Sequence, residues 1–326
     1  TCPCALALAV PTVQVVASGR LFRSGVLLKS GSALERLAEV DRVVFDKTGT
    51  LTHGRPELIA QGIEAEALNL AASLAAASKH PLSKALMRAH PGAVAASGVR
   101  EIPGFGLSLD TPLGEVRLGR RDWCGASDAA ATENPELWLS RPAHSPCQFS
   151  FRDALREDAA ATVARLAAQG YAPELLSGDT AAAVARAADL VGLASRRAAV
   201  GPADKVVRLD ELKAQGHHTL MVGDGLNDAP ALAAAWVSMS PSSAADLAQN
   251  AADVIFQGDR LAPIADTLHL ARRASTLVTQ NIGLSLVYNV VTIPLAMAGY
   301  VSPLVAAVAM SSSSLVVIVN ALRLNR

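Results

Sequence analysis

The stretch VVFDKTGTLT, residues 43–52, begins as a short apolar strand and passes at Asp46 into small and polar side chains. Two further apolar stretches, LLSGD at residues 175–179 and LMVGD at residues 220–224, also run into an aspartate. Amphipathic helices predicted at residues 156–169 and 204–215 alternate with these strands, and each is followed by a glycine, a common helix stop. This alternation predicts an α/β fold with a parallel, doubly wound sheet.

The three strand ends define a candidate site. In doubly wound sheets, ligands bind beyond the carboxyl ends of the parallel strands. We therefore expect Asp46, Asp179 and Asp224 to converge at one edge of the sheet. A single aspartate in such a position is most simply a helix cap or a turn residue, but three strand ends of this kind indicate a catalytic site.

Asp46 has the position expected of a nucleophile. A carboxylate can attack a phosphoryl group and form an acyl phosphate, but the attack of one anion on another requires positive charge nearby. Asp224 and Asp228 offer the hard oxygen ligands that Mg²⁺ prefers, and Lys205, near the start of a predicted helix, supplies a cation. Ser177 and Gly178 offer further donors to the phosphate oxygens, a hydroxyl group and a backbone N–H.

A region of different character separates the first strand from the second. Residues 54–148 contain a predicted helix at 65–77 and short strands punctuated by glycine and proline, such as 115–118. We predict that this region is a second domain inserted into the first. The first domain is then assembled from residues 38–53 and 149–262.

The composition indicates membrane helices. Of the 326 residues, 51% are hydrophobic and only 18% are charged, whereas about a quarter is charged in a typical soluble domain. The formal net charge is zero, which argues against nucleic acid as a partner. Residues 277–322 contain no Asp, Glu, Lys, Arg or His. This length accommodates two transmembrane helices, predicted at residues 276–298 and 302–322.

A third apolar segment opens the sequence. Residues 1–18 are predicted as part of a transmembrane helix, and residues 19–37 as a stalk that leads into the first domain. Because the sequence begins inside an apolar run, we expect it to be the C-terminal part of a longer protein. Basic residues flank the apolar helices, as the positive-inside rule requires of cytoplasmic ends. The lipid bilayer is therefore an expected partner, and the soluble domains are predicted to be cytoplasmic.

The opening segment carries the motif Cys2-Pro3-Cys4. Proline cannot donate a backbone hydrogen bond, so it opens the helix locally. Two thiols beside that opening in an apolar helix form a candidate site for a soft metal ion. A kinked helix with two inert thiols is the simpler alternative for the motif alone. Cys124 and Cys147 stand apart and are predicted to be ordinary thiols.

Two stretches resemble a known family. DKTGTLT at residues 46–52 and GDGLNDAPAL at residues 223–232 closely resemble the signatures of P-type ATPases, and the resemblance extends along the whole chain. It implies a haloacid-dehalogenase-like phosphorylation domain with an inserted α+β nucleotide-binding domain, in which ATP phosphorylates Asp46. By the same resemblance, Mg²⁺ is held by Asp46, Thr48 and Asp224. The rest of the phosphate pocket is implied to comprise Lys47, Ser177, Gly178, Asp179, Lys205, Asn227 and Asp228.

Two shorter motifs in the inserted domain are similar to elements of the heavy-metal branch of this family. SKHP at residues 78–81 resembles its Ser-Glu-His-Pro element, and Gly104-Phe105-Gly106 resembles its glycine pair. Lys79 stands where that branch usually has glutamate, and Ser177 where it usually has threonine. The resemblance implies that ATP is bound by His80, Pro81, Gly104 and Gly106.

The last two predicted helices favour copper(I). Tyr288-Asn289 in the first, and Met310 with Ser313 and Ser314 in the second, resemble elements of the copper(I) branch, whereas a zinc-type pump is expected to have charged residues there. Thiolate and thioether ligands suit Cu(I) by their softness, although helix packing by small residues accounts for part of the serine run. We expect an ATP-driven Cu(I) exporter of a bacterial inner membrane, supplied by a metallochaperone. The ion would be bound by Cys2, Cys4, Tyr288, Asn289, Met310 and Ser313.

Three alternatives remain open. A zinc or cadmium P-type ATPase would be distinguished by the metal that triggers phosphorylation. A membrane-tethered phosphatase of the dehalogenase-like superfamily usually has a second aspartate two residues after the nucleophile, where this sequence has Thr48. A non-catalytic metal-binding membrane module would leave the phosphorylation motifs unexplained. We also expect that the chain alone accepts phosphate without completing a transport cycle, because its sequence lacks the family's Thr-Gly-Glu loop.

Overall fold

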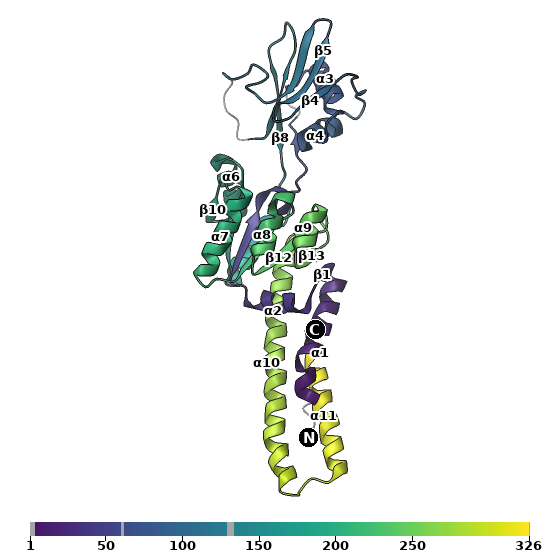
Figure 1. Cartoon of the computed structure of the whole chain (residues 1–326), viewed down its shortest axis with the longest axis vertical. Coiled ribbons are helices and arrows are strands. Elements are labelled where there is room, and N and C mark those ends of the chain that lie inside the picture. Colours follow the sequence, from purple (N-terminus) through teal and green to yellow (C-terminus); the bar gives the residue numbers. More distant parts are fainter. Residues whose placement is uncertain (1–3, 60–61, 129–133, 326) are drawn as a thin grey trace. The chain divides into compact units, whose positions relative to one another are not determined.

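The computed structural model describes residues 4–59, 62–128 and 134–325. These residues form two compact units (Figure 1). The first unit comprises the residues up to Leu51, the segment Glu157–Gly178 and the residues from Ala187 onward. The second unit comprises Thr52–Arg156 and Asp179–Arg186. The predicted fold class, an α/β domain with an inserted α+β domain and apolar helices, is confirmed.

A seven-stranded sheet forms the centre of the first unit. Its central strands β11 (Thr219–Val222), β2 (Arg42–Asp46) and β9 (Ala172–Leu176) are parallel, and Phe45 pairs with both Val222 and Leu175. Strand β1 is antiparallel to β13, and the remaining neighbours are parallel. The carboxyl ends of the three central strands are therefore level. The outer strands are β1 (Val26–Leu28), β13 (Val254–Phe256), β12 (Val237–Pro241) and β10 (Ser195–Arg197).

The central strands are mostly apolar because both faces of the sheet are covered, and the buried Glu174 of β9 forms an ion pair with Arg208 at 3.0 Å. Val44 and Met221 lie in a buried cluster with Leu209 of α7 (Pro202–Ala214) and Leu232 of α8 (Ala229–Ala234). Helix α9 (Asp246–Ala251) packs on the same cluster through a buried alanine. Two more helices of this region are α5 (Ala159–Ala168), which contacts β9, and α6 (Ala181–Val191).

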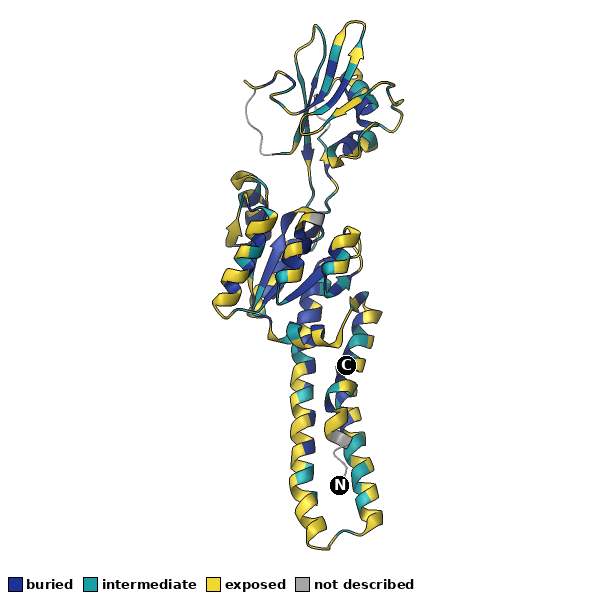
Figure 2. Ribbon diagram, in the orientation of Figure 1, coloured by how far each residue is buried: buried dark blue, intermediate teal, exposed yellow. Residues whose placement is uncertain are grey.

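Two helices in the described part of the chain are long and apolar enough to cross a membrane. They are α10 (Ala262–Met297) and the segment Pro303–Asn325, which contains α11 (Pro303–Leu322). Large apolar side chains are exposed along both helices (Figure 2), for example Val287 at 64% and Leu304 at 75%. A lipid environment would cover these side chains, since soluble surfaces rarely expose so many.

Helix α10 begins earlier than the predicted span of residues 276–298. The only proline between Ala262 and residue 276 is Pro263 in the first turn, where proline is tolerated, so the helix continues from the sheet region into the apolar part. The earlier turns bury Ile264, Leu268 and Ala271. The predicted membrane span of residues 276–298 is therefore the later part of a longer helix.

Helix α1 (Cys4–Arg23) contacts both α10 and α11. Its buried residues Ala9, Val13, Ala17 and Leu21 recur every four positions and therefore line one face of the helix. Over its described residues α1 is not among the candidate spans, so the prediction that residues 1–18 belong to a transmembrane helix stays a prediction.

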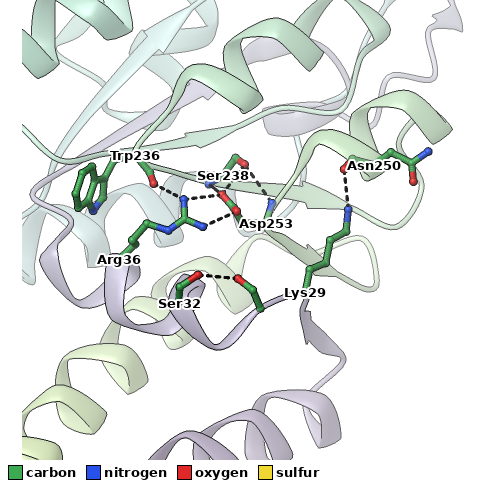
Figure 3. A network of polar contacts seen from close by, with 8 residues as sticks. Lys29, Ser32, Arg36, Trp236, Ser238, Asn250 and Asp253 are labelled. Carbon is green, nitrogen blue, oxygen red and sulfur yellow. Dashed lines mark hydrogen bonds and ion pairs between the residues drawn. The ribbon is translucent and has the colours of Figure 1, made fainter. Parts of the chain in front are cut away.

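The stalk that follows α1 is bound to the sheet by a polar network (Figure 3). Arg36 of α2 (Gly31–Glu39) donates to the carbonyl oxygen of Trp236 at 2.7 Å and forms an ion pair with Asp253 at 2.6 Å. Asp253 also accepts hydrogen bonds from the backbone N–H and the hydroxyl of Ser238. Nearby, Lys29 donates to the carbonyl oxygen of Asn250 at 3.0 Å. The network connects α2 to the sheet. Because α2 also contacts α10, it connects α10 to the sheet as well.

The second unit is a six-stranded antiparallel sheet with two helices, α3 (Ala65–Ala75) and α4 (Pro81–Ala89). Leu74 and Leu86 from these helices pack on Leu139 and Phe149 from the sheet. The structure ends the predicted helix 65–77 two residues early and extends the predicted strand 115–118 by one residue at each end. In sheet order the strands are β3 (Glu57–Leu58), β8 (Cys147–Arg152), β7 (Glu136–Ser140), β6 (Gly114–Gly119), β5 (Gly106–Thr111) and β4 (Arg100–Ile102).

Candidate functional site

Three carboxylates meet at the carboxyl edge of the seven-stranded sheet. Asp46 is the last residue of β2, Asp224 lies two residues beyond β11, and Asp228 ends the short 3-10 turn Leu226–Asp228. One carboxylate oxygen from each lies within 4.8 Å of the others. Asp46 and Asp228 are buried and Asp224 is half-buried. The level ends of parallel strands β2 and β11 bring these groups together although about 180 residues separate them in sequence.

Lys205 connects two of these carboxylates. Its ammonium Nζ lies 2.5 Å from Oδ1 of Asp46 and 2.6 Å from Oδ1 of Asp228, and its side chain is 6% exposed. The lysine is positioned by the start of α7, where Pro202 occupies the first turn and Asp204 accepts a hydrogen bond from the backbone N–H of Gly201 at 3.0 Å. The predicted cation therefore lies directly beside the predicted nucleophile.

The surroundings shift the pKa values of both partners. Burial, the largest cause, and the negative charge of Asp228 raise the pKa of Asp46, Lys205 lowers it, and the net result is a pKa of about 6. Burial opposes the charge on Lys205, but Asp46 and Asp228 outweigh it and raise the pKa of the lysine above its usual range. At neutral pH Asp46 is thus mostly an ionised carboxylate held against a charged ammonium group, the form that a nucleophile needs.

The carboxylate cluster fits a magnesium ion. Its donor set consists of hard carboxylate oxygens, which Mg²⁺ prefers, and three such groups converge within 4.8 Å of one another. Asp46 and Asp224 are the residues placed to hold such an ion. The side chain of Thr48, the third predicted ligand, is exposed in the turn after β2.

Two glycines that the sequence analysis did not single out are required by this geometry. Gly49 has a φ of 71°, and a Cβ atom there would lie 1.6 Å from Oδ2 of Asp224. A Cβ atom on Gly223 would lie 2.9 Å from the Cβ of Asp228. Asp228 is also held by the backbone N–H of Gly225, at 3.2 Å from its Oδ2. The recurring glycines within DKTGT and GDGLND were the available signal for these close approaches.

Asp179 does not belong to the carboxylate cluster in the described residues, so the expected convergence holds for Asp46 and Asp224 but not for Asp179. Strand β9 ends at Leu176, which leaves Asp179 three residues past the strand, in the part of the chain assigned to the second unit. Asp228 takes the third place instead, because the 3-10 turn after β11 brings it back towards Asp224.

The other predicted residues of the phosphate pocket are positioned by the turns after the strands. Lys47 is buried directly after β2, and Asn227 is exposed on the 3-10 turn. Ser177 is buried, and its backbone is held between Arg197 and Val200 by hydrogen bonds of 3.1 and 3.0 Å. Gly178, next to it, is exposed.

The predicted nucleotide residues gather around strand β4 of the second unit. His80 caps the N-terminus of α4, where its Nδ1 accepts the backbone N–H of Leu82 at 3.3 Å, and both His80 and Pro81 are exposed. Ser78 of the same loop donates to the carboxylate of Glu101 at 2.8 Å. Gly104, with a φ of 81°, turns the chain from β4 into β5.

Gly106 begins β5 beside Gly119 of β6. A Cβ atom on Gly106 would lie 2.3 Å from the carbonyl oxygen of Leu118, so only glycine permits this approach. The structure therefore brings the SKHP loop and the glycine turn to the same strand and leaves both open to solvent.

The predicted ligands of the transported metal are distributed over three helices. Cys2 lies outside the described residues, and Cys4 is the first residue of α1. Tyr288 and Asn289 are half-exposed on α10, and Met310 and Ser313 are half-exposed on α11. The hydroxyls of Ser313 and Ser314 donate to the carbonyl oxygen of Met310 on their own helix, at 2.8 and 3.3 Å. The described candidates for such a site therefore lie on α1, α10 and α11.

The sequence matches one family profile and several curated proteins. Residues 40–235 match the family described as haloacid dehalogenase-like hydrolase. "Nitrogen fixation protein FixI" of Bradyrhizobium diazoefficiens is 48% identical over 329 residues, covering 99% of this chain and 45% of that protein. "Copper-exporting P-type ATPase" of Mycobacterium tuberculosis is 40% identical over 342 residues, covering 100% of this chain and 45% of that protein. The chain therefore spans less than half the length of these curated relatives.

A solved structure is similar over the whole chain. The crystal structure of a zinc-transporting PIB-type ATPase in the E2.Pi state aligns with 100% of this chain and 56% of its own, with a TM-score of 0.80 and 32% identity. The alignment therefore includes the apolar helices as well as the two units that carry the candidate site residues.

Proposed function

Because the chain belongs to the haloacid dehalogenase-like hydrolase family and matches the C-terminal part of heavy-metal P-type ATPases, we propose that it is the catalytic and terminal membrane part of an ATP-driven Cu(I) exporter. The transported ion is the substrate, and ATP is the phosphoryl donor. The full cycle belongs to a longer polypeptide, of which this chain corresponds to somewhat less than half.

The observation that carries this proposal is the buried contact of Asp46 with Lys205. A surface carboxylate would be hydrated and unremarkable in its reactivity, but Asp46 is 6% exposed and held at 2.5 Å from an ammonium group. That ammonium group can neutralise the charge that accumulates when an anionic nucleophile approaches an anionic phosphate. Asp228 shares the lysine and keeps it in place.

In the proposed reaction, Oδ of Asp46 forms a bond to the γ-phosphorus of ATP. The bond from that phosphorus to the bridging oxygen breaks, and ADP leaves with the electron pair. Lys205 holds the carboxylate oriented, and Ser177 and Gly178 offer a hydroxyl group and a backbone N–H to the phosphate oxygens. Bound between Asp46 and Asp224, Mg²⁺ would supply further neutralisation of phosphate charge. The nucleotide itself is bound by His80, Pro81, Gly104 and Gly106.

A phosphatase of the same superfamily is the second candidate, and Thr48 argues against it. Rapid hydrolysis of an acyl phosphate needs a general base that activates water. In this chain the position two residues after Asp46 is a threonine whose side chain is exposed. An acyl phosphate formed here would persist, as a transport cycle requires.

The choice of Cu(I) is supported by the absence of charged residues from residues 277–322 and by the copper-exporting relative. The zinc-transporting structural relative makes a zinc or cadmium pump the alternative. In either case the ion would be bound at Cys2 and Cys4 together with groups on α10 and α11. A metallochaperone would deliver Cu(I), since the free ion is scarce and reactive.

We further propose that the chain resides in a bacterial inner membrane with both soluble units in the cytoplasm. Arg272 and Arg273 lie before the apolar part of α10, and Arg323 follows α11. Arg20 and Arg23 stand at the corresponding end of α1. Five arginines at one end of three helices agree with the positive-inside rule.

The test is phosphorylation from labelled ATP, scored by sensitivity to hydroxylamine, which cleaves acyl phosphates. The chain is joined to the N-terminal half of its polypeptide in membranes and incubated with Cu(I), with Zn²⁺ or with neither. The control is Asp46→Asn, which keeps the shape of the side chain and removes the nucleophile. Label that requires Cu(I) and disappears in the control is the expected result.

Other outcomes change the proposal in defined ways. Label triggered by Zn²⁺ alone would replace the ion and keep the mechanism. Label that forms without metal and decays within seconds would favour the phosphatase. Folded protein that takes up no label at all would overturn both.

A further inference from the structure

Asn281 is a fully buried polar residue in the apolar part of helix α10, with 0% of its surface exposed. Its Nδ2 lies 3.4 Å from the carbonyl oxygen of Ala9 in α1 and 3.5 Å from the carbonyl oxygen of Val317 in α11. Its Oδ1 accepts a shorter hydrogen bond, 2.9 Å, from Nδ2 of Asn320 in α11. One side chain therefore contacts both of the other apolar helices.

These contacts engage all the polar groups of the amide. An asparagine side chain offers two N–H donors and one carbonyl oxygen, and the three contacts use both ends. In an apolar environment no water replaces a lost partner, so an unpaired amide is costly. All the hydrogen-bonding groups of the Asn281 amide are paired only when Ala9, Val317 and Asn320 lie at the same height along the helices as Asn281. The amide therefore selects one register of α1, α10 and α11.

The position of the amide contact along the helices can be compared with the positions of the proposed metal ligands. Asn281 precedes Tyr288 by seven residues, which corresponds to about 10 Å of helix, and Val317 follows Ser313 by four residues, or about 6 Å. Ala9 follows Cys4 by five residues, or about 8 Å. Because α10 runs antiparallel to α1 and α11, all three offsets point towards the sheet of the first unit (Figure 1). The amide contact thus lies one to two turns on the sheet side of Cys4, Tyr288 and Ser313, which are among the proposed metal ligands.

We propose that Asn281 is a positioning residue for the transported metal. Its amide holds α1 against α10 and α11 and so keeps the start of α1 at Cys4 in register with Tyr288–Asn289 and Met310–Ser313. The N–H donors and the carbonyl oxygen of Asn281 are hydrogen-bonded to protein groups. Asn281 therefore acts on the metal site through the helices and is not itself a metal ligand. This inference rests on the proposed function, because it concerns the geometry of the transported ion's site.

The experiment measures the metal concentration that gives half-maximal labelling of Asp46 from ATP, together with the maximal label. Asn281→Leu removes the amide at similar volume, and Asn320→Leu removes its partner from α11. The matched control is Thr279→Val, two residues away on α10, because the hydroxyl of Thr279 bonds only to Ser275 of its own helix and is exposed. The double variant Asn281→Leu with Asn320→Leu tests whether the two residues act through one contact.

We expect Asn281→Leu and Asn320→Leu to raise the half-maximal metal concentration about three- to thirtyfold, the range that corresponds to losing an interhelical hydrogen bond in a membrane. The maximal label is expected to match that of the unmodified chain, whereas a general loss of structure would lower it at every metal concentration. The double variant should be no worse than Asn281→Leu alone.

Each remaining result counts against the inference. Half-maximal concentrations equal to that of Thr279→Val would show that the amide does not position the metal site. If the effects of the two single variants add fully in the double variant, Asn281 and Asn320 do not act through their mutual contact. A lowered maximal label with an unchanged half-maximal concentration would assign Asn281 a role in folding only. Absence of metal-triggered label in the unmodified chain would instead overturn the proposed function, and the inference with it.

Discussion

At the scale of single residues, the charge balance of the site depends on Lys205. It lies 159 residues from Asp46 in sequence, yet its ammonium group is within hydrogen-bonding distance of both Asp46 and Asp228. The two carboxylates keep the pKa of Lys205 above its usual range, so the lysine remains charged throughout the pH range in which proteins are stable. Its positive charge lowers the repulsion that a phosphate group would meet beside Asp46 and Asp228.

Lys205→Met tests this balance. The variant removes the charge and leaves two buried carboxylates without their common partner, so we expect labelling of Asp46 to fall about 100-fold or more and the free energy of unfolding to fall by about 3–5 kcal/mol. Labelling from ATP and urea unfolding measure the two effects. Lys213→Met, an exposed lysine in the last turn of the same helix, is the control and should change neither; normal labelling of Lys205→Met would refute the role of the lysine.

Gly49→Ala tests the close approach of the backbone to Asp224. At a φ of 71° the new methyl group would lie 1.6 Å from Oδ2 of Asp224, so the carboxylate must move and labelling should be lost. The positive φ alone costs about 1–2 kcal/mol for a residue with a Cβ atom. Gly216→Ala is the matched control, because Gly216 has a φ of 85° with no atom within 4 Å of the added Cβ. Gly216→Ala should lose the same amount of stability and keep its labelling from ATP. Equal labelling of Gly49→Ala and Gly216→Ala would contradict the prediction.

At the scale of elements, α10 combines two environments in one continuous helix. Arg272, in its early turns, donates to the carbonyl oxygens of Gln169 and Val40 and lies 4.0 Å over the ring of Tyr171. The later turns expose leucine and valine. A helix bound to the sheet at one end and apolar at the other is suited to transmit movement, and the Arg36–Asp253 network supplies a second connection through α2.

Asp253→Ala tests the strength of this second connection. The change removes the partner of Arg36 and of the Ser238 backbone N–H, both in partly buried positions, so we expect a loss of about 1–3 kcal/mol in the free energy of unfolding. Urea unfolding of the chain in detergent measures it. Asp266→Ala removes an ion pair with Arg165 whose side chains are 58% and 42% exposed, and such a pair should contribute at most about 1 kcal/mol. Equal losses in the two variants would mean that the network adds no more than a surface ion pair.

At the scale of the whole molecule, catalytic and nucleotide-binding candidates are divided between two units. Asp46, Lys205, Asp224 and Asp228 all belong to the first, and the SKHP loop and the glycine turn belong to the second. Each set of described residues can therefore be altered by substitution within a single unit.

The 326-residue chain by itself is expected to accept one phosphate and stop. Its sequence contains no Thr-Gly-Glu loop, and Thr48 occupies the place of the base that activates water in phosphatases. Incubation of the isolated chain with labelled ATP should yield at most one hydroxylamine-sensitive phosphate per chain, with no continuing release of inorganic phosphate. Sustained metal-dependent turnover by the chain alone would contradict this expectation.

Much of the architecture could be predicted from local sequence patterns. The strand ahead of Asp46, the inserted domain and the apolar helix pair follow from hydrophobic runs, glycine positions and uncharged length. The predicted membrane span of residues 276–298 did not indicate that its helix begins at Ala262, because charged residues lower the hydropathy without interrupting the helix. Asp228 was predicted beside Asp224, but Asp179 was also expected to converge with them, because the pattern of a strand running into an aspartate does not say how far beyond the strand the side chain lies.

The sequence by itself determined most of the secondary structure, the parallel sheet and the choice of Asp46 as the proposed nucleophile, because these depend on residues that are neighbours along the chain. Only the tertiary structure decided which groups meet. Lys205 joins Asp46 to Asp228, Gly49 makes room for Asp224, and Asn281 binds two other helices through one amide. Such contacts join residues from about 23 to more than 270 positions apart. Their distances are set by how strands and helices pack, which no local pattern of side chains encodes.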